Sequence, residues 1–188
     1  MRIVGGELGG RRLAALGKGD AKAALRPTTD RLREALFNVL EGGRYGDPVT
    51  GARVLDLFAG TGALGLEALS RGAAEAVFVE SGRVGQGLIR DNIRALGLGG
   101  RARLIARDAT RPGHSSGLMA GLVFLDPPYG RDLGARALAA AAWGGWLAED
   151  ALIVWEEAAP MDPPEGFETL EERRYGGTVF TLMRWGGA

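Results

Sequence analysis

Short apolar runs alternate with amphipathic stretches along the chain from residue 53 onward. The apolar runs that we predict to be strands are 53–57, 75–80, 102–106, 121–125, 151–155, about 167–174 and 178–185. The stretches with helical periodicity are 63–71, 82–96 and 132–146. Strands that alternate with helices are typical of a parallel, doubly wound sheet, so we predict an α/β fold with a seven-stranded, mostly parallel sheet. The glycine pair between the last two runs predicts a closing antiparallel hairpin.

The first 42 residues follow a different pattern. Residues 2–13, RIVGGELGGRRL, have apolar positions around glycine turns and predict a short strand pair. Residues 26–42, RPTTDRLREALFNVLEG, predict a helix, because Thr28 or Thr29 can cap its start and Gly42 can end it. The apolar positions of this helix fall on one stripe, formed by Leu32, Ala35, Leu36, Val39 and Leu40.

Composition places the chain among ordinary globular proteins. Of its 188 residues, 46% are hydrophobic and 24% are charged, which suits one domain with its own core. We therefore expect residues 1–188 to form a single domain, with a basic hairpin and arm over 1–25 and a helix over 26–42 that leads into the core. Cysteine is absent, which excludes disulfides and a cysteine nucleophile. No apolar run reaches the ~18 residues of a membrane span, so we expect a soluble, cytoplasmic protein. We also expect that it holds no metal.

Charge is unevenly distributed although the net charge is zero. Residues 1–33 contain eight Arg or Lys residues and three acids, so this segment carries +5 and the rest of the chain carries −5. A basic segment on an otherwise neutral body predicts a polyanionic partner for that segment. The alternative is a solvated N-terminus with no partner.

A glycine-rich turn lies directly between a predicted strand and a predicted helix. In VLDLFAGTGALGLEAL, residues 54–69, Gly60, Gly62 and Gly65 fit the pattern G-x-G-x-x-G. Such a turn lets a ligand approach the backbone at the electropositive start of a helix. The pattern alone is shared by sites for NAD, FAD and S-adenosylmethionine, so other residues must decide between these cofactors.

Three acids follow three successive predicted strands. Asp56 lies four residues before Gly60, Glu80 lies 20 residues after it, and Asp108 ends the third strand. Glu80 can accept hydrogen bonds from both hydroxyls of a ribose, and Asp108 can accept one from an adenine amine. A negative Asp56 beside the turn repels a pyrophosphate but suits a sulfonium and an ammonium group. We therefore predict an S-adenosylmethionine site at the carboxyl edge of the sheet.

Asp126-Pro127-Pro128-Tyr129 follows the fourth predicted strand, at the same edge. Two prolines fix the backbone, so the Asp126 carboxylate and the Pro127 carbonyl can both accept hydrogen bonds from one planar amine. These acceptors favour a tetrahedral nitrogen with a free lone pair, which can then attack a methyl group. Tyr129 offers an aromatic ring on which the base can stack. We predict that these four residues form the catalytic site of an exocyclic-amine methyltransferase; a stiff turn with a half-buried tyrosine is the alternative.

These motifs resemble a known family. LDLFAGTGALGLEALSRGA and FLDPPYG resemble the class I, Rossmann-like N-methyltransferases, and RIVGGELGGRRL with LRPTTDRLREALFNVL resembles the RsmD family, bacterial enzymes that methylate guanine N2 in 16S ribosomal RNA. The resemblance implies S-adenosylmethionine as cofactor and 16S rRNA or the assembling small subunit as partner. Nothing in the sequence demands a dimer, so we expect a monomer. The cofactor residues that the resemblance implies are Asp56, Phe58, Ala59, Gly60, Thr61, Gly62, Glu80, Asp108 and Ala109. The RNA-binding residues are Arg11, Arg12, Arg26, Thr28 and Thr29.

One position departs from the family. Its members usually carry a polar or acidic residue two places beyond the ribose-binding acid, where this chain has Gly82, so the contact there falls to the backbone or to Arg83. Three rival functions stay open. A DNA adenine-N6 methyltransferase would need a target-recognition domain, for which 188 residues leave no room. An NAD-dependent oxidoreductase would need a hydride-transfer partner such as a Tyr/Lys or His base, and a non-catalytic RNA-binding subunit would not need Asp126.

Overall fold

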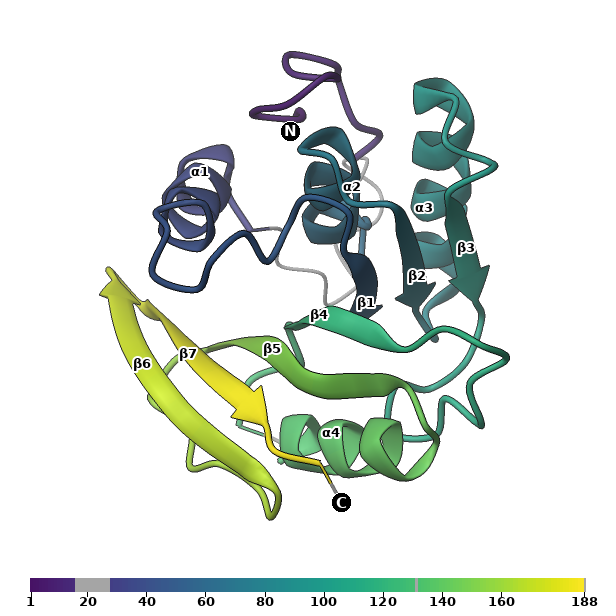
Figure 1. Ribbon diagram of the computed structural model, residues 1–188. Coiled ribbons are helices and arrows are strands. Elements are labelled where there is room, and N and C mark those ends of the chain that lie inside the picture. The colour runs from purple at the N-terminus through teal and green to yellow at the C-terminus, as the bar shows by residue number, and fades with distance from the viewer. Residues whose placement is uncertain (16–27, 131, 188) are drawn as a thin grey trace.

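A computed structural model describes residues 1–15, 28–130 and 132–187. Four helices and seven strands are assigned within these residues (Figure 1). In chain order the elements are α1 (Asp30–Leu40), β1 (Arg53–Leu57), α2 (Ala63–Ser70), β2 (Glu75–Val79), α3 (Arg83–Leu96), β3 (Ala102–Ile105), β4 (Ala120–Leu125), α4 (Leu133–Trp143), β5 (Leu147–Glu157), β6 (Phe167–Tyr175) and β7 (Thr178–Trp185).

The seven strands form one sheet in the order β3-β2-β1-β4-β5-β7-β6. Strands β1 to β5 pair parallel with one another, whereas β7 pairs antiparallel with both β5 and β6. This confirms the predicted mostly parallel α/β sheet with its closing antiparallel hairpin. The strand order reverses between β1 and β4, and the carboxyl ends of strands at such a switch point form the ligand crevice of open α/β sheets.

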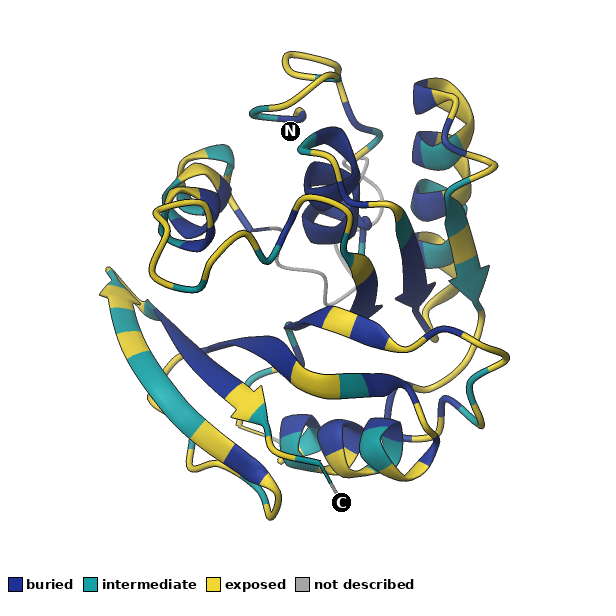
Figure 2. Ribbon diagram, viewed as in Figure 1, coloured by how far each residue is buried: buried dark blue, intermediate teal, exposed yellow. Residues whose placement is uncertain are grey.

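Alternating strand residues feed two separate cores, one on each face of the sheet. Helices α1, α2 and α3 cover one face, where Leu36 of α1 and Leu66 of α2 pack with Phe78 and Phe124 of the strands. Helix α4 covers part of the other face, where Leu138 packs with the strands. Figure 2 shows the central strands buried and the outer side of α3 exposed. The connection 106–119 between β3 and β4 contains no helix. This loop contributes Ala109 and Leu118 to the core on the same face as α4.

The N-terminal loop, residues 1–15, is held differently from the predicted strand pair. It contains a single antiparallel bridge, between Arg2 and Arg12, and the amide of Ile3 donates to the carbonyl of Arg11 at 2.9 Å. The amides of Gly10 and Leu13 also donate across the loop, to the carbonyls of Ile3 and Met1 at 2.9 and 3.2 Å. Those of Val4 and Gly5 donate instead to the buried Glu67 carboxylate of α2, at 2.8 and 2.7 Å. The loop is therefore fixed to α2.

The two largest differences from the predicted boundaries are at the starts of β5 and α1. Strand β5 begins at Leu147 rather than at 151, because Leu147 already pairs with Ala120 of β4. The register then shifts, so that Leu122 pairs with Leu152, and the extra residues lie in β5 over 148–151. Helix α1 begins at Asp30, and Thr29 caps it by accepting a hydrogen bond from the Leu32 amide at 3.2 Å. In the part of the chain that the structure describes, no helix is long and apolar enough to cross a membrane.

Candidate active site

The two predicted loops lie next to each other because β1 and β4 are neighbours in the sheet. Asp56 of β1 is in register with Phe124 of β4, and Leu57 is in register with Leu125. The amide of Asp126 continues this pairing by donating to the carbonyl of Leu57 at 3.4 Å. The glycine turn therefore leaves the sheet beside the Asp126–Tyr129 loop, as two separate motifs converging on one crevice would require.

The glycine turn has a left-handed backbone at several positions. Phe58, Gly60 and Gly62 have φ angles of 58°, 57° and 77°, and Gly62 caps α2 without a side-chain hydrogen bond. Glycine tolerates this conformation, whereas a phenylalanine is strained in it, and such strain concentrates at functional sites. The turn leads directly into the start of α2, and a helix N-terminus is electropositive.

Glu80 joins the glycine turn to the start of α3. Its side chain is 8% exposed, and its two carboxylate oxygens accept hydrogen bonds from the Gly60 amide at 2.8 Å and the Gly82 amide at 2.6 Å. Each oxygen keeps a further lone pair with which it can accept from a ligand hydroxyl. The absence of a side chain at Gly82 suits this arrangement, since a Cβ there would lie 3.0 Å from a Glu80 oxygen.

Asp56 lies beneath the turn rather than beside it. The residue is 2% exposed, and its Oδ2 accepts a hydrogen bond from the Gly65 amide at 3.0 Å. Burial raises the pKa of this carboxyl to about 8, and the nearby Glu80 carboxylate adds to the rise, against the lowering effect of the Gly65 amide. At neutral pH Asp56 is therefore mostly protonated when no cation is near, which modifies the predicted picture of a fixed negative charge.

Asp108 and Ala109 follow β3 at the same edge. The Asp108 side chain is exposed, and its Oδ1 accepts from both the amide and the hydroxyl of Thr110 at 2.8 Å. These hydrogen bonds, led by the one from the amide, hold its pKa below the usual range, so Asp108 stays ionised. Ala109 is 3% exposed and packs in the core below α4, so only its backbone is placed to contact a ligand.

The side chains at this edge indicate which cofactor it fits. Asp56, Glu80 and Asp108 surround the turn with carboxyl groups that accept hydrogen bonds, and no Lys or Arg contact to Glu80 or Asp56 is found among the described residues. Carboxylates repel a pyrophosphate but accept from ribose hydroxyls and amines and attract a cation. The residues present therefore fit S-adenosylmethionine better than a dinucleotide.

The Asp126–Tyr129 loop is partly exposed and supported from below. Asp126 and Tyr129 are half-buried, Pro127 is buried and Pro128 is exposed. Directly behind the loop, the Gly130 amide donates to Glu157 of β5 at 3.0 Å. The buried Pro127 and this hydrogen bond restrain the loop at both ends, which suits a site that positions a substrate amine.

Two carboxylates that the sequence analysis missed complete this edge. Glu156 and Glu157 end β5, the neighbour of β4, and are 5% and 7% exposed. Glu156 accepts a hydrogen bond from the Thr28 hydroxyl at 2.9 Å, and the Tyr129 hydroxyl lies 3.5 Å from its other oxygen. Two acids at the end of an apolar run, ALIVWEE, were the available indication, because the carboxyl end of every parallel strand meets this edge.

The predicted RNA-binding residues are divided by the structure. Thr28 is buried against Glu156 and Thr29 is exposed at the start of α1. Arg11 and Arg12 are exposed on the N-terminal loop, where the Arg11 guanidinium donates to the Ala95 carbonyl near the end of α3 at 2.9 Å. Arg26 lies outside the described residues.

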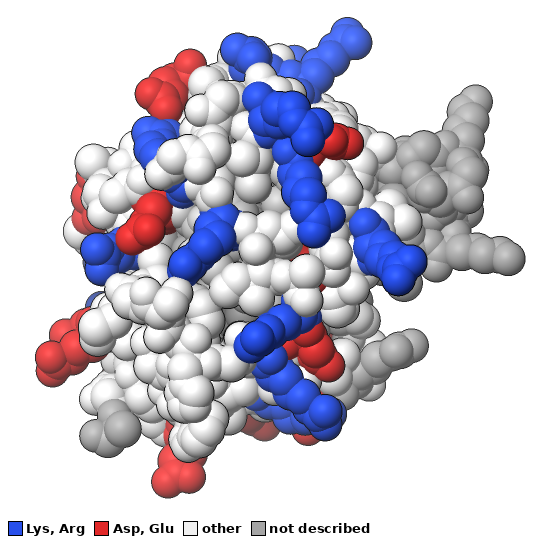
Figure 3. All heavy atoms as spheres, turned by 90° about the vertical axis from the view of Figure 1, so that its right-hand side faces the viewer, with Lys and Arg blue, Asp and Glu red and all other residues white. Residues whose placement is uncertain are grey.

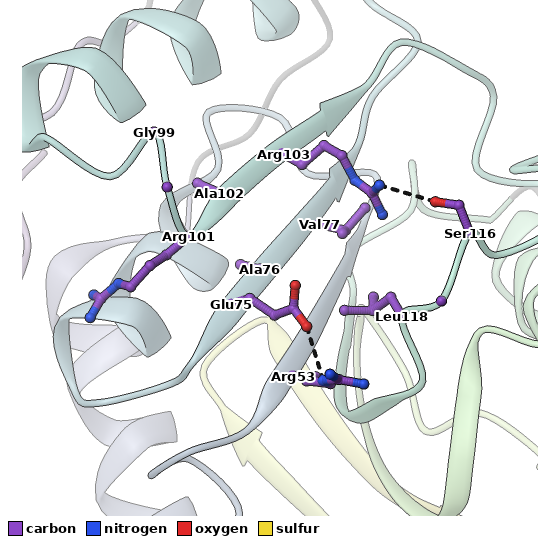
Figure 4. Close-up of a pocket in the computed structure, with 12 residues that line it drawn as sticks. Arg53, Glu75, Ala76, Val77, Gly99, Arg101, Ala102, Arg103, Ser116 and Leu118 are labelled. Carbon is purple, nitrogen blue, oxygen red and sulfur yellow. Dashed lines mark hydrogen bonds and ion pairs between the residues drawn. The ribbon is translucent and has the colours of Figure 1, made fainter.

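A separate pocket lies at the opposite end of the strands. It has a volume of about 390 Å³ and is lined at the amino ends of β1, β2 and β3. Its cations are paired within the protein: Arg53 with Glu75 at 2.9 Å, and Arg103 with the Ser116 hydroxyl at 3.0 Å (Figure 4). The pocket therefore lies at the edge of the sheet opposite the glycine turn and is not part of the candidate active site.

A family model, curated proteins and solved structures all match nearly the whole chain. The family model described as conserved hypothetical protein 95 matches residues 1–184. Ribosomal RNA small subunit methyltransferase D of Escherichia coli K12 is 43% identical over 98% of this chain and 89% of its own, and the protein of that name from Haemophilus influenzae is 31% identical over 98% and 93%. The solved structure of yhhF from Escherichia coli has a TM-score of 0.81 and 35% identity, covering 100% of this chain and 99% of its own.

Proposed function

The chain belongs to the family described as conserved hypothetical protein 95, and from that membership we propose that it transfers a methyl group from S-adenosylmethionine to the exocyclic N2 amine of a guanine in 16S ribosomal RNA. Its relatives named ribosomal RNA small subunit methyltransferase D support this activity over 98% of the chain. The observation that carries the proposal is the register of β1 with β4, which sets the glycine turn beside the Asp126–Tyr129 loop.

In this proposal the glycine turn and the acids hold the methyl donor. The backbone of Phe58, Ala59, Gly60, Thr61 and Gly62 lies against the donor, Glu80 accepts from its ribose hydroxyls, and Asp108 with the Ala109 backbone contacts its adenine. When bound, the donor supplies a sulfonium methyl group. Asp56 lies beneath the turn, so its carboxylate is stabilised when a cation approaches.

The Asp126 loop activates the acceptor. The target base leaves its stack and lies against the Tyr129 ring, a contact worth about 1–3 kcal/mol. The Asp126 carboxylate and the Pro127 carbonyl accept hydrogen bonds from the N2 amine, and Pro128 holds their geometry. The bound donor would supply its sulfonium methyl group to this nitrogen lone pair, and Asp126 or water would take the proton that the amine releases. Positioning and electrostatics supply the catalysis.

RNA contacts lie outside the crevice. Arg11 and Arg12 are exposed and present cations to phosphates. The family resemblance implies that Thr28 binds RNA. We assign it instead to supporting Glu156, because its hydroxyl already donates a hydrogen bond to that carboxylate. Thr29 and Arg26 stay assigned to RNA. The finer proposals are that the chain acts as a monomer, in the cytoplasm, on 16S rRNA or on the assembling small subunit.

One experiment tests the activity directly. Small subunits and 16S rRNA are purified from a bacterial strain that lacks the protein, incubated with the enzyme and methyl-labelled S-adenosylmethionine, and digested to nucleosides. We expect label in N2-methylguanosine and none with the Asp126→Ala variant. Label in N6-methyladenosine of DNA would favour the adenine methyltransferase instead, and binding of a nicotinamide dinucleotide without methyl transfer would favour the oxidoreductase.

A further inference from the structure

A second basic segment lies in the body of the protein. Residues 83–111 contain seven arginines and two aspartates, a balance of +5 that equals that of residues 1–33. This segment spans α3, β3 and the start of the following loop. Arg83 follows Gly82, and Arg111 helps to lower the pKa of Asp108. Arg90 and Arg94 have no contact with the candidate active site among the interactions found in the described residues, so their charge has no role in the proposed chemistry.

Three of these arginines form a stripe on the outer side of α3. Arg83, Arg90 and Arg94 are spaced by seven and four residues, which places them on one helix face, and all three are exposed. From Arg83 to Arg94 the stripe is about 16 Å long at 1.5 Å per residue. One acid faces it: Asp91, 3.1 Å from Arg94, in a pair whose side chains are 61% and 78% exposed. An exposed pair of this kind leaves the arginine available to another partner.

The N-terminal loop extends this stripe. The Arg11 guanidinium donates to the Ala95 carbonyl at 2.9 Å, beside Arg94, and Arg12 is exposed next to it. The loop is not free to move away, because the Ala14 amide also donates to the Asn92 side chain at 2.6 Å. Figure 3 faces this side of the molecule and shows basic side chains from its top to its lower part, with single acids among them. We call the exposed set Arg83, Arg90, Arg94, Arg11 and Arg12 the arginine track.

We propose that the arginine track binds the phosphate backbone of the substrate RNA at a distance from the methylated guanine. This inference rests on the proposed function and adds a second contact region to it. The track begins at Arg83, three residues after Glu80, and runs along α3 away from the sheet edge. A strand of RNA that follows it therefore leads to the candidate active site. Exposed guanidinium groups in a row suit phosphates because they form charge-assisted, bidentate hydrogen bonds.

The test neutralises the middle of the track and measures RNA binding as a function of salt. The variant Arg90→Gln/Arg94→Gln leaves Arg83 beside the donor site intact, and Arg90→Glu/Arg94→Glu is the stronger change. Arg174→Gln, on the exposed face of β6, is the matched control for general loss of charge. Binding of a 16S rRNA fragment is measured between 50 and 200 mM KCl, thermal unfolding checks the fold, and methyl transfer is measured on the same preparations.

We expect the slope of log affinity against log salt to become shallower by about 0.7 for each lost phosphate contact, hence by about 1.4 for the neutral double variant. The KM for RNA rises while kcat at saturating RNA and the affinity for S-adenosylmethionine stay unchanged. An unchanged slope and KM in both double variants would overturn the arginine track. Weaker binding of assembled particles with unchanged binding of naked RNA would also overturn it and assign the surface to a ribosomal protein. If the unmodified enzyme does not methylate rRNA, the proposed function is wrong. That outcome is distinguished from failure of the arginine track, because it does not depend on the variants.

Discussion

The hydroxyl of Thr28 donates a 2.9 Å hydrogen bond to the carboxylate of Glu156, which lies 128 residues further along the chain. Both residues are buried. The contact ties the segment that enters α1 to the end of β5, and the same carboxylate lies beside the Tyr129 hydroxyl. The loop predicted to hold the target base is thus connected to the N-terminal part of the protein through one side chain.

Replacing Thr28 by valine tests this connection. The variant Thr28→Val keeps the shape of the side chain but removes the donor, and a hydrogen bond to a charged group is worth about 1.5–3 kcal/mol. We expect the free energy of unfolding, measured by urea denaturation, to fall by about that amount. Thr169→Val, on β6, is the control, since no side-chain hydrogen bond of Thr169 is found among the described residues and valine suits a strand. Equal stability of the two variants would contradict the role of Thr28.

Asp126 is expected to control methyl transfer without affecting donor binding. The variant Asp126→Ala removes the acceptor for the substrate amine, so transfer to rRNA should fall below detection. Asp126→Asn keeps one acceptor oxygen and should retain measurable activity between that of Asp126→Ala and the unmodified enzyme. Isothermal titration with S-adenosylmethionine should give the same affinity for all three proteins. Full activity of Asp126→Ala would remove Asp126 from the mechanism.

Tyr129 separates stacking from hydrogen bonding. Tyr129→Phe keeps the ring and loses the hydroxyl, which lies 3.5 Å from Glu156, so kcat/KM should change by less than about threefold, in line with a long hydrogen bond. Tyr129→Ala also loses base stacking, which is worth about 1–3 kcal/mol or roughly 5- to 150-fold. Steady-state kinetics with rRNA measure both. A large defect in Tyr129→Phe would show that the hydroxyl matters more than the ring.

Asp56 should make the free protein less stable as the pH rises. Its pKa is about 8 in the folded protein and about 4 in an unfolded chain, so between these values only the folded state holds the proton. Stability then falls with rising pH, by up to about 1.4 kcal/mol per pH unit from this group. In Asp56→Asn this dependence is absent, so its thermal midpoint should exceed that of the unmodified protein most strongly near pH 8. Parallel stability curves for the two proteins between pH 5 and pH 8 would contradict the shifted pKa.

The same variant should bind the methyl donor poorly. A cation near Asp56 stabilises the ionised form and lowers its pKa, so donor affinity of the unmodified protein should rise as the pH is increased toward 8. Asp56→Asn cannot ionise, and titration calorimetry should show both weaker binding and the loss of this rise. A gain in stability with a loss of binding is the usual trade-off of a binding site.

Gly65 is expected to matter for packing rather than for ligand contact. A Cβ on Gly65 would lie 2.5 Å from the Phe78 ring, so Gly65→Ala should reduce the free energy of unfolding by about 1–3 kcal/mol. The double variant Gly65→Ala/Phe78→Leu has room for the added methyl group. In urea denaturation, its loss of stability should be smaller than the sum of the two single losses. Additive losses would mean that the two side chains do not compete for space.

Sequence reasoning located the parts of the site that are encoded locally. The turn around Gly60 and the loop that begins at Asp126 each follow an apolar run, and the spacing of glycine and proline gives them a defined backbone. The alternation of strands and helices also predicted the sheet, because each element buries one face. What this reasoning could not give was the environment of each group, such as the burial that shifts the pKa of Asp56.

Contacts between distant segments were the features missed. Glu67 lies in an apolar helix and looks like an exposed polar position, yet it is fully buried and accepts the amides of Val4 and Gly5. Glu156 likewise gains its role only because β5 is the neighbour of β4 and Thr28 returns to this edge. The arginine stripe of α3 was overlooked for another reason: net charge was compared between the N-terminus and the rest, which hid a basic helix among acidic segments.

Strand β7 is the last strand of the described chain, but it lies between β5 and β6 rather than at the rim of the sheet. During synthesis, Glu156 and Glu157 therefore gain their backbone partners, Phe180 and Val179, only after the chain has been made through β7. Until then β5 exposes unpaired amides and carbonyls, which invite pairing with other nascent chains. Chains that stop before β7 lack the strand that joins β5 to β6, so only a translation product that extends through β7 can form the complete sheet.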